Sequence, residues 1–177
     1  MKKYEFTGET KEIRLLFRTA TLHRIRATVA FGIVEVGDLG GWIEKEENLS
    51  HEGKAWVCGD AKVWGNAKVC GDAKVWGNAE VWGNAKVCGD AKVFSASHVL
   101  VIGAIGSRND FTTFYRDKDN EITVKCGCFL GKIDRFLEKV TQTHGDSKYA
   151  LVYRAAVEVA KLQIDLSGEA PKDADEE

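Results

Sequence analysis

The amino-acid sequence predicts a mainly β fold, a left-handed parallel β-helix of about 3.5 coils followed by a C-terminal ββαα module. Three observations support this prediction: a six-residue repeat between Gly59 and Phe94, alternation of small apolar and polar residues within each repeat, and a Gly-Asp or Gly-Asn pair at each boundary. A period of six residues is typical of parallel β-helices, in which each hexapeptide forms one short strand and one corner. Three hexapeptides form a coil, so residues eighteen apart are expected to stack at the ~4.8 Å spacing of neighbouring strands.

Each repeat is expected to bury two of its side chains. Side chains alternate between the faces of a strand, so in residues 60–64 Ala61 and Val63 share the inner face while the other three side chains point outward. The same Ala and Val positions recur along the repeat and predict a narrow apolar interior. The Gly and the Asn or Asp at each boundary adopt positive φ at little cost, which suits them to the corners.

Stacking at eighteen residues sorts the outward positions into three faces. The first face stacks Cys58, Trp76 and Phe94 beside Trp56, Lys74 and Lys92; the second stacks Trp64, Trp82 and Leu100 beside Lys62, Glu80 and His98; the third stacks Cys70 and Cys88 beside Lys68 and Lys86. Two faces therefore carry aromatic side chains, and the third carries thiols.

The flanking segments divide the chain into four predicted parts. Residues 1–40 are expected to form N-terminal cap strands that cover the open edge of the first coil, and residues 41–105 the hexapeptide β-helix. Residues 106–166 are expected to form the ββαα module, and residues 167–177 a disordered acidic tail.

Within the module, the turn residues 117–120 lie between two β-like runs, 111–115 and 121–126, which predicts a hairpin. Apolar residues from Ile133 to Val140 recur at spacings of three and four, which predicts a helix that ends at Gly145. A second amphipathic helix is expected after Asp146.

The charge, the apolar runs and the cysteines of the sequence indicate which partners and which cellular compartment to expect. With 25 basic and 27 acidic residues the net charge is -2, so binding to nucleic acid is not indicated. No apolar run approaches the ~20 residues that span a bilayer, and no signal-peptide pattern follows Met1, so a cytoplasmic location is expected. Five cysteines without a secretion signal predict reduced thiols, with Cys70 and Cys88 as packing or corner residues.

The entry into the repeat carries a more specific pattern than the repeat itself. It comprises Leu-His-Arg-Ile-Arg-Ala at 22–27, Phe-Gly at 31–32, Gly-Asp-Leu-Gly-Gly-Trp-Ile-Glu at 37–44, Asn-Leu-Ser at 48–50 and Gly-Lys-Ala-Trp-Val at 53–57. Over about residues 20–100 the sequence resembles the YdcK-like β-solenoid proteins of bacteria and phages, which are labelled transferases by fold analogy and have no assigned catalytic residue.

Two further motifs, Cys-Gly-Cys-Phe at 126–129 and Thr-His-Gly at 143–145, together with the short repeat, look like the compact version found in phage and prophage genomes. The resemblance implies a phage accessory protein in the cytoplasm of a bacterial host. Small phage proteins of this type often inhibit host defence by binding a host protein or signal.

The candidate binding residues are Trp64, Trp82, Trp76, Phe94, Lys74 and Lys92. A contiguous exposed aromatic stripe is typical of a binding surface, although the terminal segments or a second copy of the chain would cover the same columns. The two lysines would suit a phosphate or a nucleic-acid backbone, but aspartates alternate with the lysines, and charge balance for solubility explains them as well.

A second candidate is a cluster of Cys126, Cys128 and His144. The two cysteines are two apart on a predicted strand and share a face, and His144 lies at the end of the following helix, as a thiolate–imidazole pair or a metal site would require. Three ligands without a fourth favour buried structural cysteines, so no metal, cofactor or catalytic residue is assigned. His98, in the outward column of the second face, is expected to be solvated rather than a general base.

These observations favour a non-enzymatic protein that binds a host protein or protein complex through a rigid β-solenoid and the C-terminal module, and inhibition of a bacterial defence system is the role that the resemblance implies. A homo-oligomer, either a dimer or a trimer, is expected. Two alternatives stay open: a trimeric hexapeptide acyltransferase-like enzyme, and a protein that sequesters a nucleotide signal with Lys and Trp side chains. No nucleophile, base and orienting group occur together at readable spacing, which disfavours the enzyme.

Overall fold

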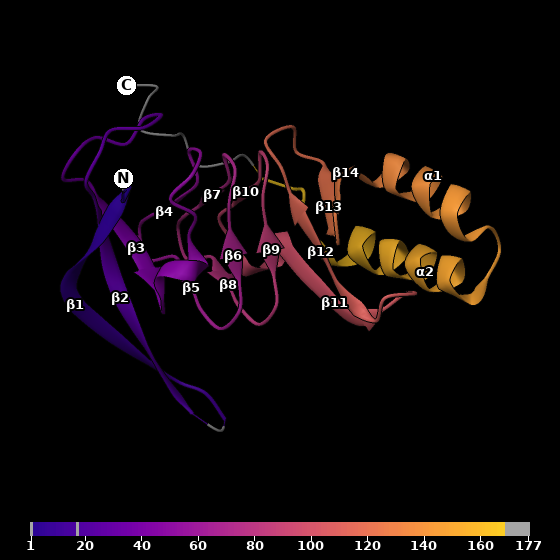
Figure 1. Cartoon of the computed structure of the whole chain (residues 1–177), viewed down its shortest axis with the longest axis horizontal. Coiled ribbons are helices and arrows are strands. Elements are labelled where there is room, and N and C mark those ends of the chain that lie inside the picture. Colours follow the sequence, from indigo (N-terminus) through magenta and orange to yellow (C-terminus); the bar gives the residue numbers. More distant parts are fainter. Residues whose placement is uncertain (1, 17, 169–177) are drawn as a thin grey trace.

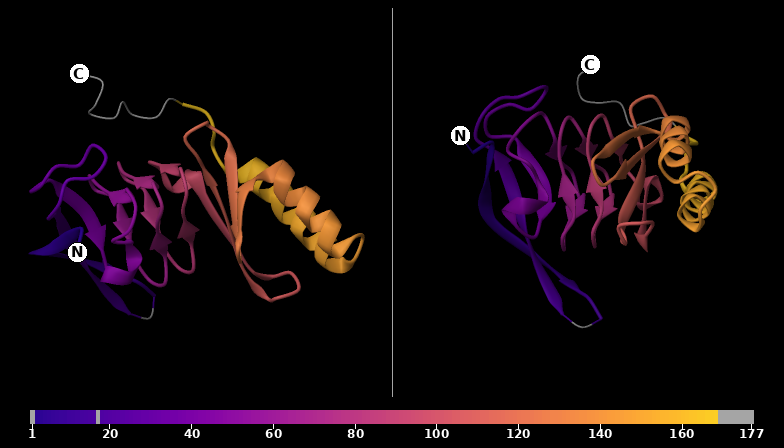
Figure 2. Two further views of the ribbon diagram at one scale, coloured as in Figure 1. Left: turned by 45° about the horizontal axis from the view of Figure 1, so that its top comes forward. Right: turned by 45° about the vertical axis from the view of Figure 1, so that its right-hand side comes forward.

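The computed structural model describes residues 2–16 and 18–168 and shows an elongated molecule (Figure 1). The hexapeptide repeats lie in its middle, a long β-hairpin lies at one end, and two helices lie side by side at the other (Figures 1 and 2). The hairpin reaches well beyond the repeats on one side of the molecule.

Three strands cover the first repeats. β1 (Tyr4–Arg14) pairs antiparallel with β2 (Thr19–Ala27), and β2 pairs antiparallel with β3 (Leu39–Ile43). The Tyr4 hydroxyl donates a hydrogen bond to the Leu49 carbonyl at 2.9 Å, and the Lys3 ammonium donates one to the Ala55 carbonyl at 2.7 Å. Because both bonds are buried, they hold the beginning of the chain against the repeats.

Each repeat contributes a strand of only two residues. These strands are β4 (Trp56–Val57), β5 (Lys62–Val63), β6 (Lys68–Val69), β7 (Lys74–Val75), β8 (Glu80–Val81), β9 (Lys86–Val87) and β10 (Lys92–Val93). They pair in parallel with the strand eighteen residues further along, as β4 with β7, β7 with β10, β5 with β8 and β6 with β9. The predicted stacking at eighteen residues is therefore confirmed.

The interior of the repeats is lined by the alanine and valine positions, as predicted. Val57, Val75 and Val93 lie opposite one another in successive strands and are fully buried. The corners are tight: Gly71 has a φ of +71°, and a Cβ atom there would lie 2.8 Å from the backbone nitrogen of Gly89. Both the positive φ and this close approach require glycine at that corner.

The C-terminal part is an antiparallel sheet covered by two helices. The sheet runs in the order β11 (Val99–Ile105), β12 (Asp110–Arg116), β13 (Ile122–Cys126) and β14 (Phe129–Lys132), and α1 (Ile133–His144) and α2 (Lys148–Gln163) follow. The predicted hairpin and both predicted helices are confirmed. Two short 3-10 helices, Glu46–Asn48 and Ala96–His98, lie at the two ends of the repeats.

The predicted fold class, a mainly β left-handed parallel β-helix of about 3.5 coils with a ββαα module, was wrong. The described residues form several small, separate sheets, of which the largest is a mixed five-stranded sheet and the next an antiparallel four-stranded one, together with two helices. The repeats supply strands too short to dominate the architecture, whereas the flanks supply long antiparallel strands and both helices. β11 shows this most directly: it lies within the range predicted for the β-helix but pairs with β12.

Two further predictions concern the acidic tail and the absence of a membrane-spanning segment. Of the predicted tail at 167–177, only Ser167 and Gly168 are described; their carbonyls accept hydrogen bonds from the Arg116 guanidinium, and the remainder lies outside the described residues. None of the helices in the described part of the chain has the length and apolar character that crossing a bilayer requires.

Candidate functional site

The last strand of the stack is β10 on the first face, β9 on the third and β8 on the second, and among the described residues the backbone edge of β8 has no hydrogen bond to the segment that follows it. On the first face β7 is covered by β10, and on the third face the Lys86 amide donates to the Thr113 hydroxyl of β12 at 3.0 Å. On the second face the five-stranded sheet runs β1-β2-β3-β5-β8 and stops at β8. The chain leaves this face through the 3-10 helix at Ala96–His98 and enters β11, which pairs with β12 instead.

An open notch lies above this uncovered edge of β8. The notch has a volume of about 520 Å³. One wall comes from the repeats and the other from the C-terminal sheet; the lining residues are Glu80, Trp82, Gly83, Asn84, Ala85, Ala96, Val99, Leu100, Val101 and Phe111. Its volume lies in the range of ligand pockets, about 300–1,000 Å³.

The edge of β8 in the notch presents unpaired backbone donors. One layer below, the Lys62 amide donates to the Ala79 carbonyl at 3.0 Å and the Trp64 amide donates to the Val81 carbonyl at 3.1 Å. The equivalent amides of β8, those of Glu80 and Trp82, find no hydrogen-bond acceptor among residues 2–16 and 18–168. An unpaired strand edge of this kind is a template for pairing with another chain.

The corner glycines show the same open space. A Cβ atom at Gly65 would lie 3.3 Å from the backbone nitrogen of Gly83 in the next layer. A Cβ atom at Gly83 would meet nothing within 4 Å. The layer that would continue the stack is therefore missing at this corner as well.

Trp82 is the large exposed side chain of the notch. It is 59% exposed, and its ring lies parallel to that of Trp64 with the centroids 6.1 Å apart and the planes at 10°. Stacking on a buried ring restrains Trp82, so little side-chain freedom is left to lose when a partner covers it.

Trp64 itself is buried, contrary to the expectation that both tryptophans of this column are exposed. It packs with Leu22 of β2 and Trp42 of β3 and is 6% exposed. The N-terminal strands thus cover the first half of the aromatic column, and Trp82 alone stays open.

The aromatic column of the first face is partly covered by the C-terminal segments. Trp76 and Phe94 are half-buried with their ring centroids 5.2 Å apart, and the Arg116 guanidinium lies 4.8 Å from the Phe94 ring centroid. Lys74 and Lys92 lie opposite each other in β7 and β10, are half-buried, and each interacts with other groups of the chain. This face offers less open apolar surface than the notch.

His98 is buried, so the expectation of a solvated residue was wrong. Its Nδ1 accepts a hydrogen bond from the Phe94 amide at 3.3 Å, and its ring lies edge-on to the Phe94 ring. Burial, followed by the nearby Arg116, lowers the pKa of His98, so the neutral form is favoured. A side chain held in this way supports the turn into β11.

The structure separates the predicted thiol cluster. Cys126 is half-buried at the end of β13 and accepts a hydrogen bond from the Thr112 hydroxyl at 3.3 Å, and the His144 ring packs on the Tyr153 ring beside it. Cys128 lies in the turn between β13 and β14 and is exposed, so the prediction that both cysteines share a strand face was wrong. In the described part of the chain, no group of three His, Cys, Asp or Glu side chains is placed to hold a metal ion.

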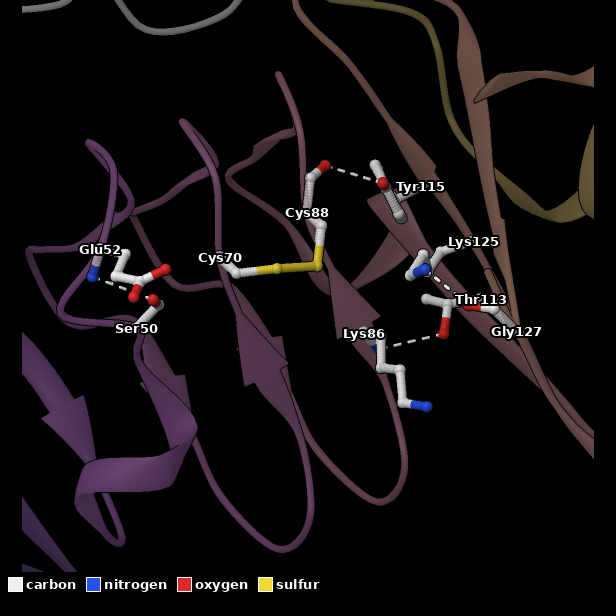
Figure 3. Close-up of a disulfide and its surroundings, with 9 residues drawn as sticks. All are labelled: Ser50, Glu52, Cys70, Lys86, Cys88, Thr113, Tyr115, Lys125 and Gly127. Carbon is white, nitrogen blue, oxygen red and sulfur yellow. Dashed lines mark hydrogen bonds between the residues drawn. A yellow bond between two sulfur atoms is a disulfide. The ribbon is translucent and has the colours of Figure 1, made fainter. Parts of the chain in front are cut away.

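On the third face the prediction of reduced thiols was also wrong, because Cys70 and Cys88 form a disulfide (Figure 3). The eighteen-residue stacking brings their Cα atoms to 4.6 Å, within the range that a disulfide bridges. The bond joins two successive layers of the stack beside β12, whose Tyr115 hydroxyl donates to the Cys88 carbonyl at 2.7 Å.

Sequence reasoning selected Trp82 but missed the notch around it. The signal was present at the end of the repeat: after Phe94 the expected Gly-Asn or Gly-Asp pair is replaced by Ser95-Ala96. The loss of the corner pair marks the position where the chain leaves the stack.

Comparison with known proteins gives this chain no assigned family. No protein-family model matches it, and no curated protein is significantly similar to it.

Proposed function

We propose that this chain is a non-enzymatic binding protein that docks a segment of a partner protein in the notch above β8. The observation that supports the proposal is the combination of unpaired Glu80 and Trp82 amides with an exposed, stacked Trp82 ring in one apolar depression. The amides would bind the main chain of the partner, and the ring would bind one of its side chains. The partner class that suits both is a protein in extended conformation.

The mode of binding that we propose is strand addition. An extended segment can pair with an exposed sheet edge, where main-chain hydrogen bonds give affinity and side-chain pockets give specificity. In the notch, carbonyl groups of the segment would accept from the Glu80 and Trp82 amides, and its apolar side chains would lie against Leu100 and Phe111. The segment would occupy the position of the next strand of the stack.

A partner from a bacterial host is the finer proposal, and it rests on the resemblance to phage accessory proteins. We propose that the occupied notch blocks a surface that the host protein needs for defence against phage. The partner is obtained by affinity capture from host lysate, with the wild-type chain compared against the notch variants described next. Restored growth of a restricted phage on expression of the wild-type chain, and not of a notch variant, would link binding to the biological role.

Replacement of Trp82 by alanine is expected to weaken binding to the captured partner by at least about 30-fold, equivalent to about 2 kcal/mol, the effect typical of a central aromatic residue in an interface. Titration calorimetry with the purified partner measures the change. Trp76→Ala is the matched control, because Trp76 occupies the same position in the repeat on the first face. Unchanged affinity of the Trp82→Ala variant would remove the notch from the proposal.

A backbone substitution tests strand addition separately from the contribution of the ring. Glu80→Pro removes the Glu80 amide hydrogen, which faces the notch. It keeps the hydrogen bonds that the Ala79 and Val81 carbonyls accept from β5. Glu80→Ala is its control, because both variants lose the 2.8 Å ion pair with Lys62. Binding lost with proline and kept with alanine supports main-chain pairing, whereas equal binding of the two variants rules it out.

A further inference from the structure

The third face of the repeats carries a second depression, away from the notch and formed by different residues. Its volume is about 580 Å³. The Cys70–Cys88 disulfide and Val69 lie along it, and lysines line it from two parts of the molecule: Lys68 and Lys86 from the repeats, and Lys125 from β13 (Figure 3 shows the last two). We call it the lysine hollow.

The three lysines follow one row across the layers. Lys68 of β6 lies directly opposite Lys86 of β9. The Lys86 amide donates to the Thr113 hydroxyl, and Thr113 lies opposite Lys125 in the neighbouring strand. Neighbouring strands are about 4.8 Å apart, so Lys68 and Lys86 enter the hollow from adjacent strands, whereas Lys125 lies one strand further, beyond Thr113.

On the second face the lysine at this position of the repeat is paired with an acidic residue, but within the described chain the lysines of this row are not. On that second face, the same position of the repeat carries Lys62 and Glu80, which form an ion pair at 2.8 Å. The side chains of Lys68 and Lys86 form no ion pair with any residue that the structure describes. Like charges directly opposite each other on adjacent strands are destabilising, so an anion between them would relieve a repulsion that the chain itself leaves in place.

The acidic residues of the hollow cancel only part of this charge, because two glutamates line it together with three lysines. Glu46 forms an ion pair with Lys2, outside the row of lysines. Glu47 is exposed and forms no ion pair within the described ranges. The Lys125 ammonium donates to the Gly127 carbonyl at 2.6 Å, which holds it at the rim without neutralising its charge.

We infer that the lysine hollow is a binding site for a compact anion with two or more negative charges. Lys68 and Lys86 would form its main charge-assisted hydrogen bonds, and Lys125 would close one side. The volume of the hollow lies in the range of small-ligand pockets. This site is independent of the notch, since the two share no lining residue.

Titration calorimetry of the full chain at low ionic strength tests the site, with inorganic pyrophosphate and citrate as separate probes. Saturable binding of one anion per chain is expected, and added salt should weaken it because the contacts are ionic. Tighter binding of pyrophosphate identifies a phosphate-type ligand, and tighter binding of citrate a polycarboxylate. Saturable binding of neither probe would overturn the inference.

Charge-deletion variants locate the bound anion. The double variant Lys68→Ala/Lys86→Ala is expected to lose at least tenfold in affinity. Lys74→Ala/Lys92→Ala is the matched control, because it removes the two lysines at the same repeat position on the first face and should leave the affinity within twofold. Thermal melting shows whether both variants are folded. An equal loss of affinity in the two variants would mean that binding depends only on the net charge of the protein, and the site would be rejected.

Discussion

Replacement of Val75 by aspartate is expected to lower the free energy of unfolding by about 4 kcal/mol or more, because a carboxyl group would enter an interior without a partner. Val75 is fully buried between Val57 and Val93, its neighbours in the strands below and above. Domains of this size are stable by only about 5–15 kcal/mol, so the variant should be largely unfolded or strongly destabilised. Urea denaturation followed by tryptophan fluorescence measures the change.

Asn78→Asp is the control for the added charge. Asn78 is exposed at the next corner, where other repeats already carry aspartate, and its replacement should change the free energy of unfolding by less than about 0.5 kcal/mol. If Val75→Asp unfolded at the same urea concentration as the wild type, the assignment of the valine positions to the interior would be refuted.

The second large effect is expected at Asp117, whose carboxylate joins three parts of the C-terminal sheet. One oxygen accepts from the backbone amides of Asp119 and Glu121, at 3.0 and 3.2 Å. The other accepts from the Thr123 hydroxyl at 2.5 Å and from the Lys132 ammonium at 2.6 Å. Asp117→Ala should cost about 2–3 kcal/mol, because the Thr123 hydroxyl and the two amides lose their charged acceptor, whereas the half-exposed Lys132 keeps its ion pair with Glu121.

The stability that Asp117 contributes should depend on pH. Burial alone would raise the pKa of Asp117, but the hydrogen bonds from Lys132, Thr123 and the two amides outweigh it and lower the pKa. The contribution is therefore complete above the ordinary aspartate pKa, about 3.9, and is lost as the pH falls through the lower pKa of the folded state. The difference in stability between the wild type and Asp117→Ala should thus shrink between about pH 5 and pH 2.

Urea denaturation across this pH range measures the difference, and Asp119→Ala is the control. Asp119 also approaches Lys132, at 3.3 Å, but its side chain is exposed, so its loss should cost less than about 1 kcal/mol. A difference between the wild type and Asp117→Ala that stayed constant down to pH 2 would contradict the assignment of a charged Asp117 to the network.

The repeat region shows how much the sequence alone can predict. The six-residue period and its Ala and Val positions predicted the eighteen-residue pairing of β4 with β7 and the buried valines, because strand alternation and strand spacing follow from backbone geometry alone. The hairpin around Asp117 and the two helices were predicted for the same reason, since their turn residues and apolar spacing are local signals.

The fold class failed because it depends on pairings that are not local. The loss of the corner pair at Ser95-Ala96 marks where the chain leaves the stack, but nothing near Val99 indicates that β11 then pairs with β12. Likewise, nothing near Leu22 indicates that the N-terminal strands cover Trp64. The two candidate sites also depend on contacts that are not local. The repeat predicts that Trp82 and Lys86 point outward, but which residues surround them depends on where the flanking segments pack.

The sequence by itself thus determined the layers of the repeat, the inward and outward positions, and the stacking of equal positions, including the closeness of Cys70 to Cys88 that allows their disulfide. Only the tertiary structure decided that the stack stops at β8 on one face, that Trp64 is covered while Trp82 is exposed, and that Lys125 joins Lys68 and Lys86 in one hollow. The physical reason is that periodicity fixes which residues can be neighbours within the stack, whereas burial by distant segments depends on where the long strands of the flanks find their partners.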